Sequence, residues 1–144
     1  MKTVSTNTAT VIDSPHVAPI LLAELTFTSP ASYTLPLSSR PFDPFNFFGP
    51  YCYDPLIAGH STIQTGELNE DTYALNPGDM TLDILNGVPT GGFNSFGEFL
   101  NAYDFTFATV TIRLIFENAR QDDDDIPIYT GRIEAPEDLD ADIV

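Results

Sequence analysis

The fold is decided by a stretch that reads V110-T-I-R-L-I-F116, then Q121-D-D-D-D125, then I126-P-I-Y-T-G-R-I-E134. Apolar and polar residues alternate in both flanking segments, which is typical of strands with one buried face and one wet face. Four aspartates separate the segments, and a run of like charge at a hairpin tip predicts a solvated loop. The stretch therefore predicts two neighbouring strands.

Turn residues and alternation predict further strands on the amino-terminal side of this stretch. The predicted segments are Val17–Thr28 and 32–37 as a hairpin, Ile57–Thr65, Met80–Leu85, Phe105–Glu117 with a bulge or break near Ala108-Thr109, and Ile126–Ile133. A polar loop is expected over Gly66–Pro77. Ser95 and Glu98 fit a capping box, and Phe96, Phe99, Leu100 and Tyr103 follow at helical spacing. One short helix is therefore expected near residues 95–103.

These elements predict an all-β fold, mainly an antiparallel sandwich or a partly open barrel, with one short helix and extended termini. Alternation assigns faces to strands but does not distinguish a sandwich from a barrel. The predicted organisation is an arm over residues 1–15, which is flexible or docked on a partner, a single β domain over 16–134, and an acidic tail over 135–144.

Composition narrows the classes of partner. The 144 residues carry 21 acids against five bases, for a formal net charge of −16. Nucleic acid and anionic membrane surfaces would both be repelled by this charge, so neither is expected to be a partner. A single cysteine, Cys52, allows no intrachain disulfide. We expect synthesis in a cytoplasm, since no signal peptide or membrane-spanning run of about 20 apolar residues is visible.

Candidate chemical sites are weak. Asp122–Asp125 could offer hard oxygen ligands to Ca²⁺, but the run lacks the spacing and the glycine of an EF-hand. His16 and His60 stand too far apart in sequence to suggest a zinc site, and Ser61 beside His60 lacks a nucleophile elbow. No phosphate-binding motif is present. We therefore expect no catalytic residues, no metal and no cofactor, and we do not expect an enzyme.

Residues 38–56 stand apart, because four prolines interrupt a run of aromatic residues. No regular structure is expected there. Its aromatic side chains are expected to pack against the core or against a neighbouring subunit, more than against a sugar, because Phe offers no hydrogen-bonding group. The candidate interface residues are Phe42, Phe45, Phe47, Phe48, Tyr51 and Tyr53, joined by Asp138, Asp140 and Ile143 of the acidic tail.

Three places carry a resemblance to a known family: A23-E-L-T-F27 with S32-Y-T-L-P-L37, then Y53-D-P-L-I-A-G-H-S-T-I63, then M80-T-L-D-I-L-N-G87. The third place is followed by an expected aromatic helix ending near Tyr103, by the strand V110-T-I-R-L-I-F116 and by I128-Y-T-G-R-I-E134. Their order resembles that of the amino-terminal β domains of minor tail, tail-tip and baseplate hub proteins of tailed bacteriophages. The match covers about four-fifths of the chain, and its motifs contain no catalytic residue.

The resemblance implies a structural protein of a virion, most of all a tail-tip or baseplate subunit that mediates assembly. Its partners would be other structural proteins of the virion or further copies of this chain. Two alternatives remain open from the residues alone. One is a capsid decoration or cement protein, and the other is a carbohydrate-binding or Ca²⁺-binding β module.

Overall fold

The structure is a computed structural model that describes residues 19–42, 46–61, 68–69, 74–75, 79–116 and 125–134. The predicted arm over 1–15 and the acidic tail over 135–144 lie outside these residues, as do Asp122, Asp123 and Asp124.

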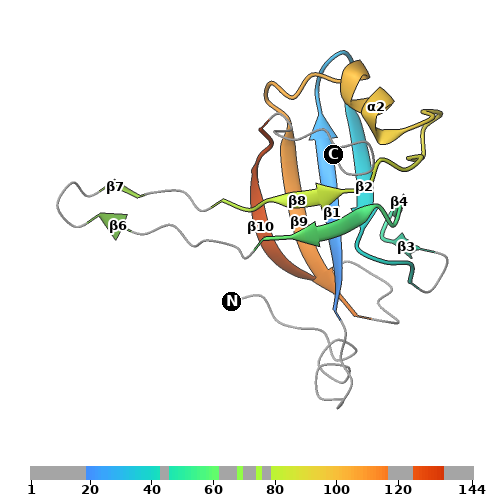
Figure 1. Ribbon diagram of the computed structural model, residues 1–144. Coiled ribbons are helices and arrows are strands. Elements are labelled where there is room, and N and C mark those ends of the chain that lie inside the picture. Colours follow the sequence, from blue (N-terminus) through green and yellow to red (C-terminus); the bar gives the residue numbers. More distant parts are fainter. Residues whose placement is uncertain are drawn as a thin grey trace.

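A four-stranded antiparallel sheet forms the centre of the fold (Figure 1). Its strands are β1 (Ile20–Phe27), β2 (Tyr33–Ser38), β9 (Thr109–Ile115) and β10 (Ile126–Arg132), in the order β10-β9-β1-β2. The register aligns Leu25 of β1 with Leu35 of β2 and with Val110 of β9. The predicted hairpin and the two strands of the deciding stretch are confirmed, and the two pairs become neighbours through β1 and β9.

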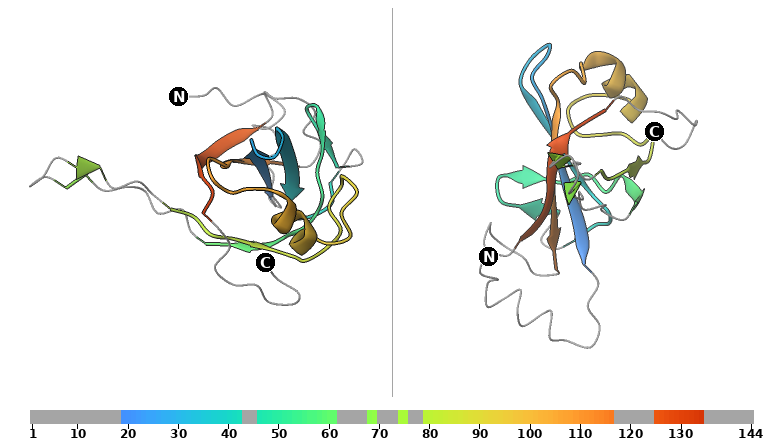
Figure 2. Two further views of the ribbon diagram at one scale, coloured as in Figure 1. Left: turned by 90° about the horizontal axis from the view of Figure 1, so that it is seen from above. Right: turned by 90° about the vertical axis from the view of Figure 1, so that its left-hand side faces the viewer.

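The remaining described elements lie around this sheet. β5 (Ile57–His60) pairs with β8 (Leu82–Ile84), and short hairpins join β3 (Phe47–Phe48) to β4 (Tyr51–Cys52) and β6 (Leu68–Asn69) to β7 (Ala74–Leu75). β5 and β8 run across the four strands in Figure 1, and the view from above in Figure 2 shows them as a separate layer. The helix α2 (Phe96–Ala102) lies at one end of the sheet. The predicted all-β, sandwich-like class with a short helix is confirmed.

Three local expectations are wrong. The segment 38–56 contains the β3–β4 hairpin, and the loop expected over Gly66–Pro77 contains β6 and β7. The strand expected from Phe105 begins only at Thr109, because Phe105–Ala108 form a turn in which the Ala108 amide donates to the Phe105 carbonyl at 3.0 Å. The parity change near Ala108 is therefore the start of the strand. The irregularity in this pair lies in β10, between Pro127 and Tyr129.

The main core fills the space between the sheet, the β5–β8 pair and α2. Its buried residues are Leu21, Ala23, Leu25, Phe27, Leu35, Leu37, Ile57, Ile84, Phe96, Phe99, Ala108, Val110 and Ile112. The Phe99 ring of α2 packs edge-on against Phe27, with 5.2 Å between the ring centroids, and stacks on Tyr103, with 4.8 Å between the centroids. Seven residues are too few for a stable isolated helix, so this aromatic packing stabilises α2.

A second, smaller core lies on the opposite face of the sheet. Ile20 and Leu22 of β1 and Ile115 of β9 point to this face and are covered by Phe42, Phe48 and Tyr53. β1 therefore starts as the continuous apolar run I20-L-L-A and alternates only afterwards, because its first half is covered on both faces. Each large side chain buried this way stabilises the fold by about 1.5–3 kcal/mol.

Candidate functional site

The predicted aromatic interface divides into buried and exposed members. Phe42, Phe48 and Tyr53 belong to the second core, with 6%, 2% and 1% of their surface exposed, so they offer little area to a partner. Tyr51 is half-buried against the same core. Phe47 is 51% exposed. Phe45, Asp138, Asp140 and Ile143 lie outside the described residues. The interface itself stays a prediction, and Phe47 is its most exposed described member.

Asn46 holds the aromatic segment in place. Its side-chain oxygen accepts from the Phe42 amide at 2.8 Å, and its carbonyl accepts from the Tyr53 amide at 2.9 Å. Asn46 adopts a left-handed φ of 60°, which asparagine tolerates better than most residues. The chain then turns through Gly49 and Pro50, so that Phe47 faces Cys52 and Phe48 faces Tyr51. The pair Gly49-Pro50 is the sequence signal that could have predicted this hairpin.

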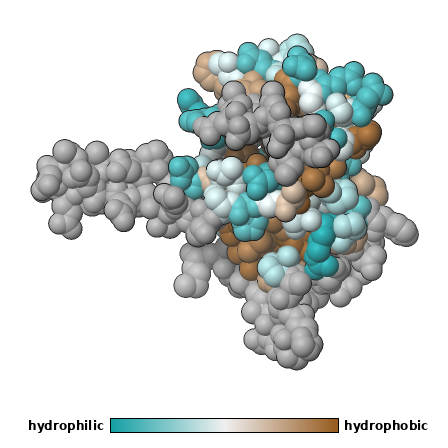
Figure 3. All heavy atoms as spheres, viewed as in Figure 1, coloured by the Kyte–Doolittle hydropathy of each residue, from teal (hydrophilic) through white to brown (hydrophobic). Residues whose placement is uncertain are grey.

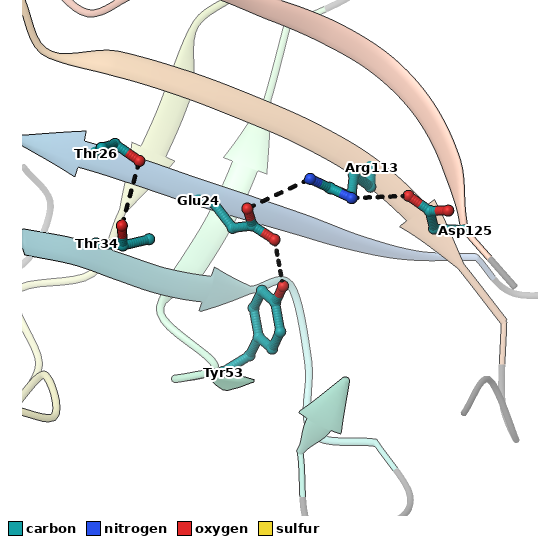
Figure 4. A network of polar contacts seen from close by, with 6 residues as sticks. All are labelled: Glu24, Thr26, Thr34, Tyr53, Arg113 and Asp125. Carbon is teal, nitrogen blue, oxygen red and sulfur yellow. Dashed lines mark hydrogen bonds and ion pairs between the residues drawn. The ribbon is translucent and has the colours of Figure 1, made fainter. Parts of the chain in front are cut away.

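A polar network links the aromatic segment to the sheet (Figure 4). The Tyr53 hydroxyl donates to Glu24 of β1 at 2.6 Å. Arg113 of β9 bridges two carboxylates, Glu24 at 3.5 Å and Asp125 at 3.1 Å. The Arg113 side chain is 27% exposed, the Glu24 side chain 16% and the Asp125 side chain 1%. Four segments of the chain, around β1, β4, β9 and the start of β10, are thereby joined on one face.

Burial and charge set the protonation of this network. Burial raises the pKa of Tyr53 well above its ordinary value, and the hydrogen bond to Glu24 adds to the rise, so the phenol remains a donor. Burial works to lower the pKa of Arg113, but Glu24 and then Asp125 outweigh it and raise that pKa. Arg113 is therefore a fixed positive charge between two carboxylates.

Asp125 corrects the expectation of a solvated acidic run. Asp125 as a whole is only 3% exposed, and its carboxylate accepts a hydrogen bond from the Arg113 guanidinium. The start of β10 places it beside β9, where Pro127 faces Arg113 in the register. The position of arginine on the polar phase of V110-T-I-R-L-I-F116 is the only sequence signal for this pairing.

His60 and Ser61 each lie within hydrogen-bond distance of a backbone atom. The Nδ1 atom of His60 lies 3.0 Å from the carbonyl oxygen of Ser61, and the Ser61 hydroxyl accepts from the Thr81 amide at 2.8 Å. His16 lies outside the described residues. Cys52 is half-buried in β4.

Among the described residues, no three His, Cys, Asp or Glu side chains are grouped so that they could hold a metal ion. No helix in the same ranges is long and apolar enough to cross a membrane. Comparison with models of protein families, with curated proteins and with solved structures finds no match to this chain.

Proposed function

We propose that this chain is a structural protein of a tailed-phage particle, a minor tail, tail-tip or baseplate subunit that holds neighbouring subunits together. The observation that carries the proposal is that two of the segments that resemble the phage tail proteins pair with each other as strands. Y53-D-P-L-I-A-G-H-S-T-I63 supplies β5 and M80-T-L-D-I-L-N-G87 supplies β8, and the two strands pair with His60 opposite Leu82. Segments that carry the resemblance therefore meet within one all-β unit.

The surface of the unit supports a role in contacts with other proteins. Phe47, the first residue of β3, is 51% exposed and Phe107 is 70% exposed. Apolar residues also reach the surface on the face that β5 and β8 cross (Figure 3). Exposed aromatic side chains of this kind are enriched at protein interfaces. The net charge of −16 favours neighbours with basic surfaces.

Mass spectrometry of purified particles from the virus that encodes this chain tests the proposal. A tail component is expected in about a dozen copies or fewer per particle, as set by the symmetry of the tail. A copy number on the order of hundreds, which matches the many equivalent positions of a capsid, would instead indicate a decoration protein. Absence from purified particles would contradict both versions.

A further inference from the structure

Phe107 lies in an unfavourable position for a phenylalanine. It is 70% exposed, and its φ of 66° places the backbone in the left-handed region. Glycine or asparagine adopts this conformation with less strain, and neither would leave a large apolar ring in water. A residue that opposes folding in both ways indicates a contact made outside the chain.

A shallow depression of about 490 Å³ lies beside this turn. Its lining residues are Tyr103, Asp104, Phe105, Thr106, Ile133 and Glu134. Two aromatic rings and an isoleucine supply apolar walls, and two exposed carboxylates supply negative charge. This combination suits the long apolar stem and charged end of a lysine or arginine side chain.

Hydrogen bonds within the chain fix the shape of the depression in the absence of a partner. The Asp104 amide donates to the Ser29 carbonyl at 3.1 Å, and the Ile133 amide donates to the Ala108 carbonyl at 3.0 Å. The Asp104 carboxylate accepts from the Thr106 amide at 2.8 Å, a bond that lowers the pKa of this acid. The carboxylate is therefore both oriented and ionised at neutral pH.

We propose that the turn at Phe105–Ala108 and the end of β10 form a docking surface for a basic segment of another protein. Phe107 inserts into an apolar site on the partner, and a lysine or arginine of the partner enters the depression. A second copy of this chain is disfavoured as the occupant, because each copy carries a net charge of −16. The inference rests on the proposed function, since the partner would be a neighbouring subunit of the particle.

Two substitutions distinguish loss of the proposed partner contact from loss of stability. Phe107→Gly is expected to leave the midpoint of thermal unfolding unchanged or a few degrees higher, while incorporation into particles falls about tenfold, as for an interface anchor. Val88→Ser is the matched control, because Val88 is 68% exposed in another loop and its loss should leave incorporation unchanged. Normal incorporation of the Phe107→Gly protein would overturn the inference and leave the proposed function standing.

A titration tests the depression without any particle. The probe is N-acetyl-arginine amide, followed by amide chemical shifts of the full chain, with the neutral citrulline analogue as control. Shift changes are expected at residues 103–107 and 132–134 with arginine only, and are expected to be lost in an Asp104→Asn and Glu134→Gln double variant. Equal changes with citrulline, or none with arginine, would overturn the assigned partner chemistry even if the protein proves to be a particle component.

Discussion

The Tyr53 hydroxyl donates a 2.6 Å hydrogen bond to the Glu24 carboxylate, and this bond joins the end of the aromatic segment to the central strand β1. Tyr53 is 1% exposed, so water cannot easily reach this site and replace its hydroxyl as the donor to Glu24. The same carboxylate also pairs with Arg113 at 3.5 Å. Glu24 therefore ties the buried Tyr53 ring and the charged Arg113 side chain together, on the face of the sheet that carries the second core.

Removing that hydroxyl is expected to destabilise the fold without leaving a large cavity. Tyr53→Phe should lower the free energy of unfolding by about 2 kcal/mol, because the lost bond has a charged acceptor. Urea denaturation followed by circular dichroism measures the change. Tyr51→Phe is the matched control on the rim of the same core and should cost less than about 0.5 kcal/mol. Equal effects of the two substitutions would contradict this role of Tyr53.

Loss of Arg113 is expected to remove the ion pair that it makes with the buried Asp125 carboxylate. Arg113→Met should lower the free energy of unfolding by about 3 kcal/mol, whereas Arg132→Met, at an exposed position on β10, should change it by less than about 0.5 kcal/mol. Adding Asp125→Leu to Arg113→Met should recover part of the loss, since the buried carboxylate that Arg113 paired with is then gone. A double variant no more stable than the single one would refute this explanation.

Stability is expected to fall in alkaline solution through Tyr53. Burial and the bond to Glu24 raise its pKa in the folded state, while the unfolded chain keeps a value of about 10. Below pH 10 the phenol is protonated in both states and contributes no pH dependence. Above pH 10 only the unfolded state loses the proton, so the free energy of unfolding falls by up to about 1.4 kcal/mol per pH unit.

Unfolding curves between pH 8 and 11.5 check this expectation. The Tyr53→Phe protein should be less stable than the wild type at pH 8 but should lose less stability as the pH rises. Parallel losses in the two proteins would show that another group is responsible.

Capping of α2 depends on Ser95. Its hydroxyl accepts from the Glu98 amide at 3.1 Å, as the sequence predicts, while the Glu98 carboxylate accepts from the Asn94 amide at 2.7 Å. Ser95→Ala should lower the free energy of unfolding by about 1 kcal/mol. Asn101→Ala, at an exposed position inside the same helix, should leave stability unchanged or slightly higher. Thermal unfolding of both variants decides whether the cap matters.

Two adjacent glycines offer a controlled comparison of steric contact. Gly91 and Gly92 have φ values of 122° and 88°, so a side chain strains the backbone at either position. A Cβ at Gly91 would also lie 2.6 Å from the Tyr33 hydroxyl, which donates to the Thr90 carbonyl, whereas at Gly92 nothing lies within 4 Å. Gly92→Ala should cost about 1 kcal/mol and Gly91→Ala about 2 kcal/mol. Equal losses in urea denaturation would argue against the contact with Tyr33.

Local patterns predicted a large part of the architecture. Alternation located β9 and β10, and the run from Val17 to Leu37 predicted the β1–β2 hairpin. Ser95 and Glu98 located α2 to within a residue at each end. These features depend on neighbours within one turn of helix or one stretch of strand, so the order of residues carries the information directly.

The burial of single aromatic residues was predicted less well. Phe42, Phe48 and Tyr53 are aromatic residues of the same proline-rich segment as the exposed Phe47, yet they fill the second core. Phe107 was assigned to a strand because Phe105 and Phe107 alternate, while the structure places it at an exposed turn. Composition cannot separate a buried aromatic ring from an exposed one when both lie in a segment rich in proline and glycine.

The order of residues by itself determined an acidic all-β chain, the positions of its principal strands and the capped helix, because periodicity and turn chemistry act over a few residues. Only the tertiary structure decided which aromatic rings are buried and which acids are paired. Glu24 and Arg113 are 89 residues apart in sequence, and they meet because the register of β1 on β9 brings them together. Such contacts depend on strand register and on what covers each face of the sheet, and these are properties of the whole fold.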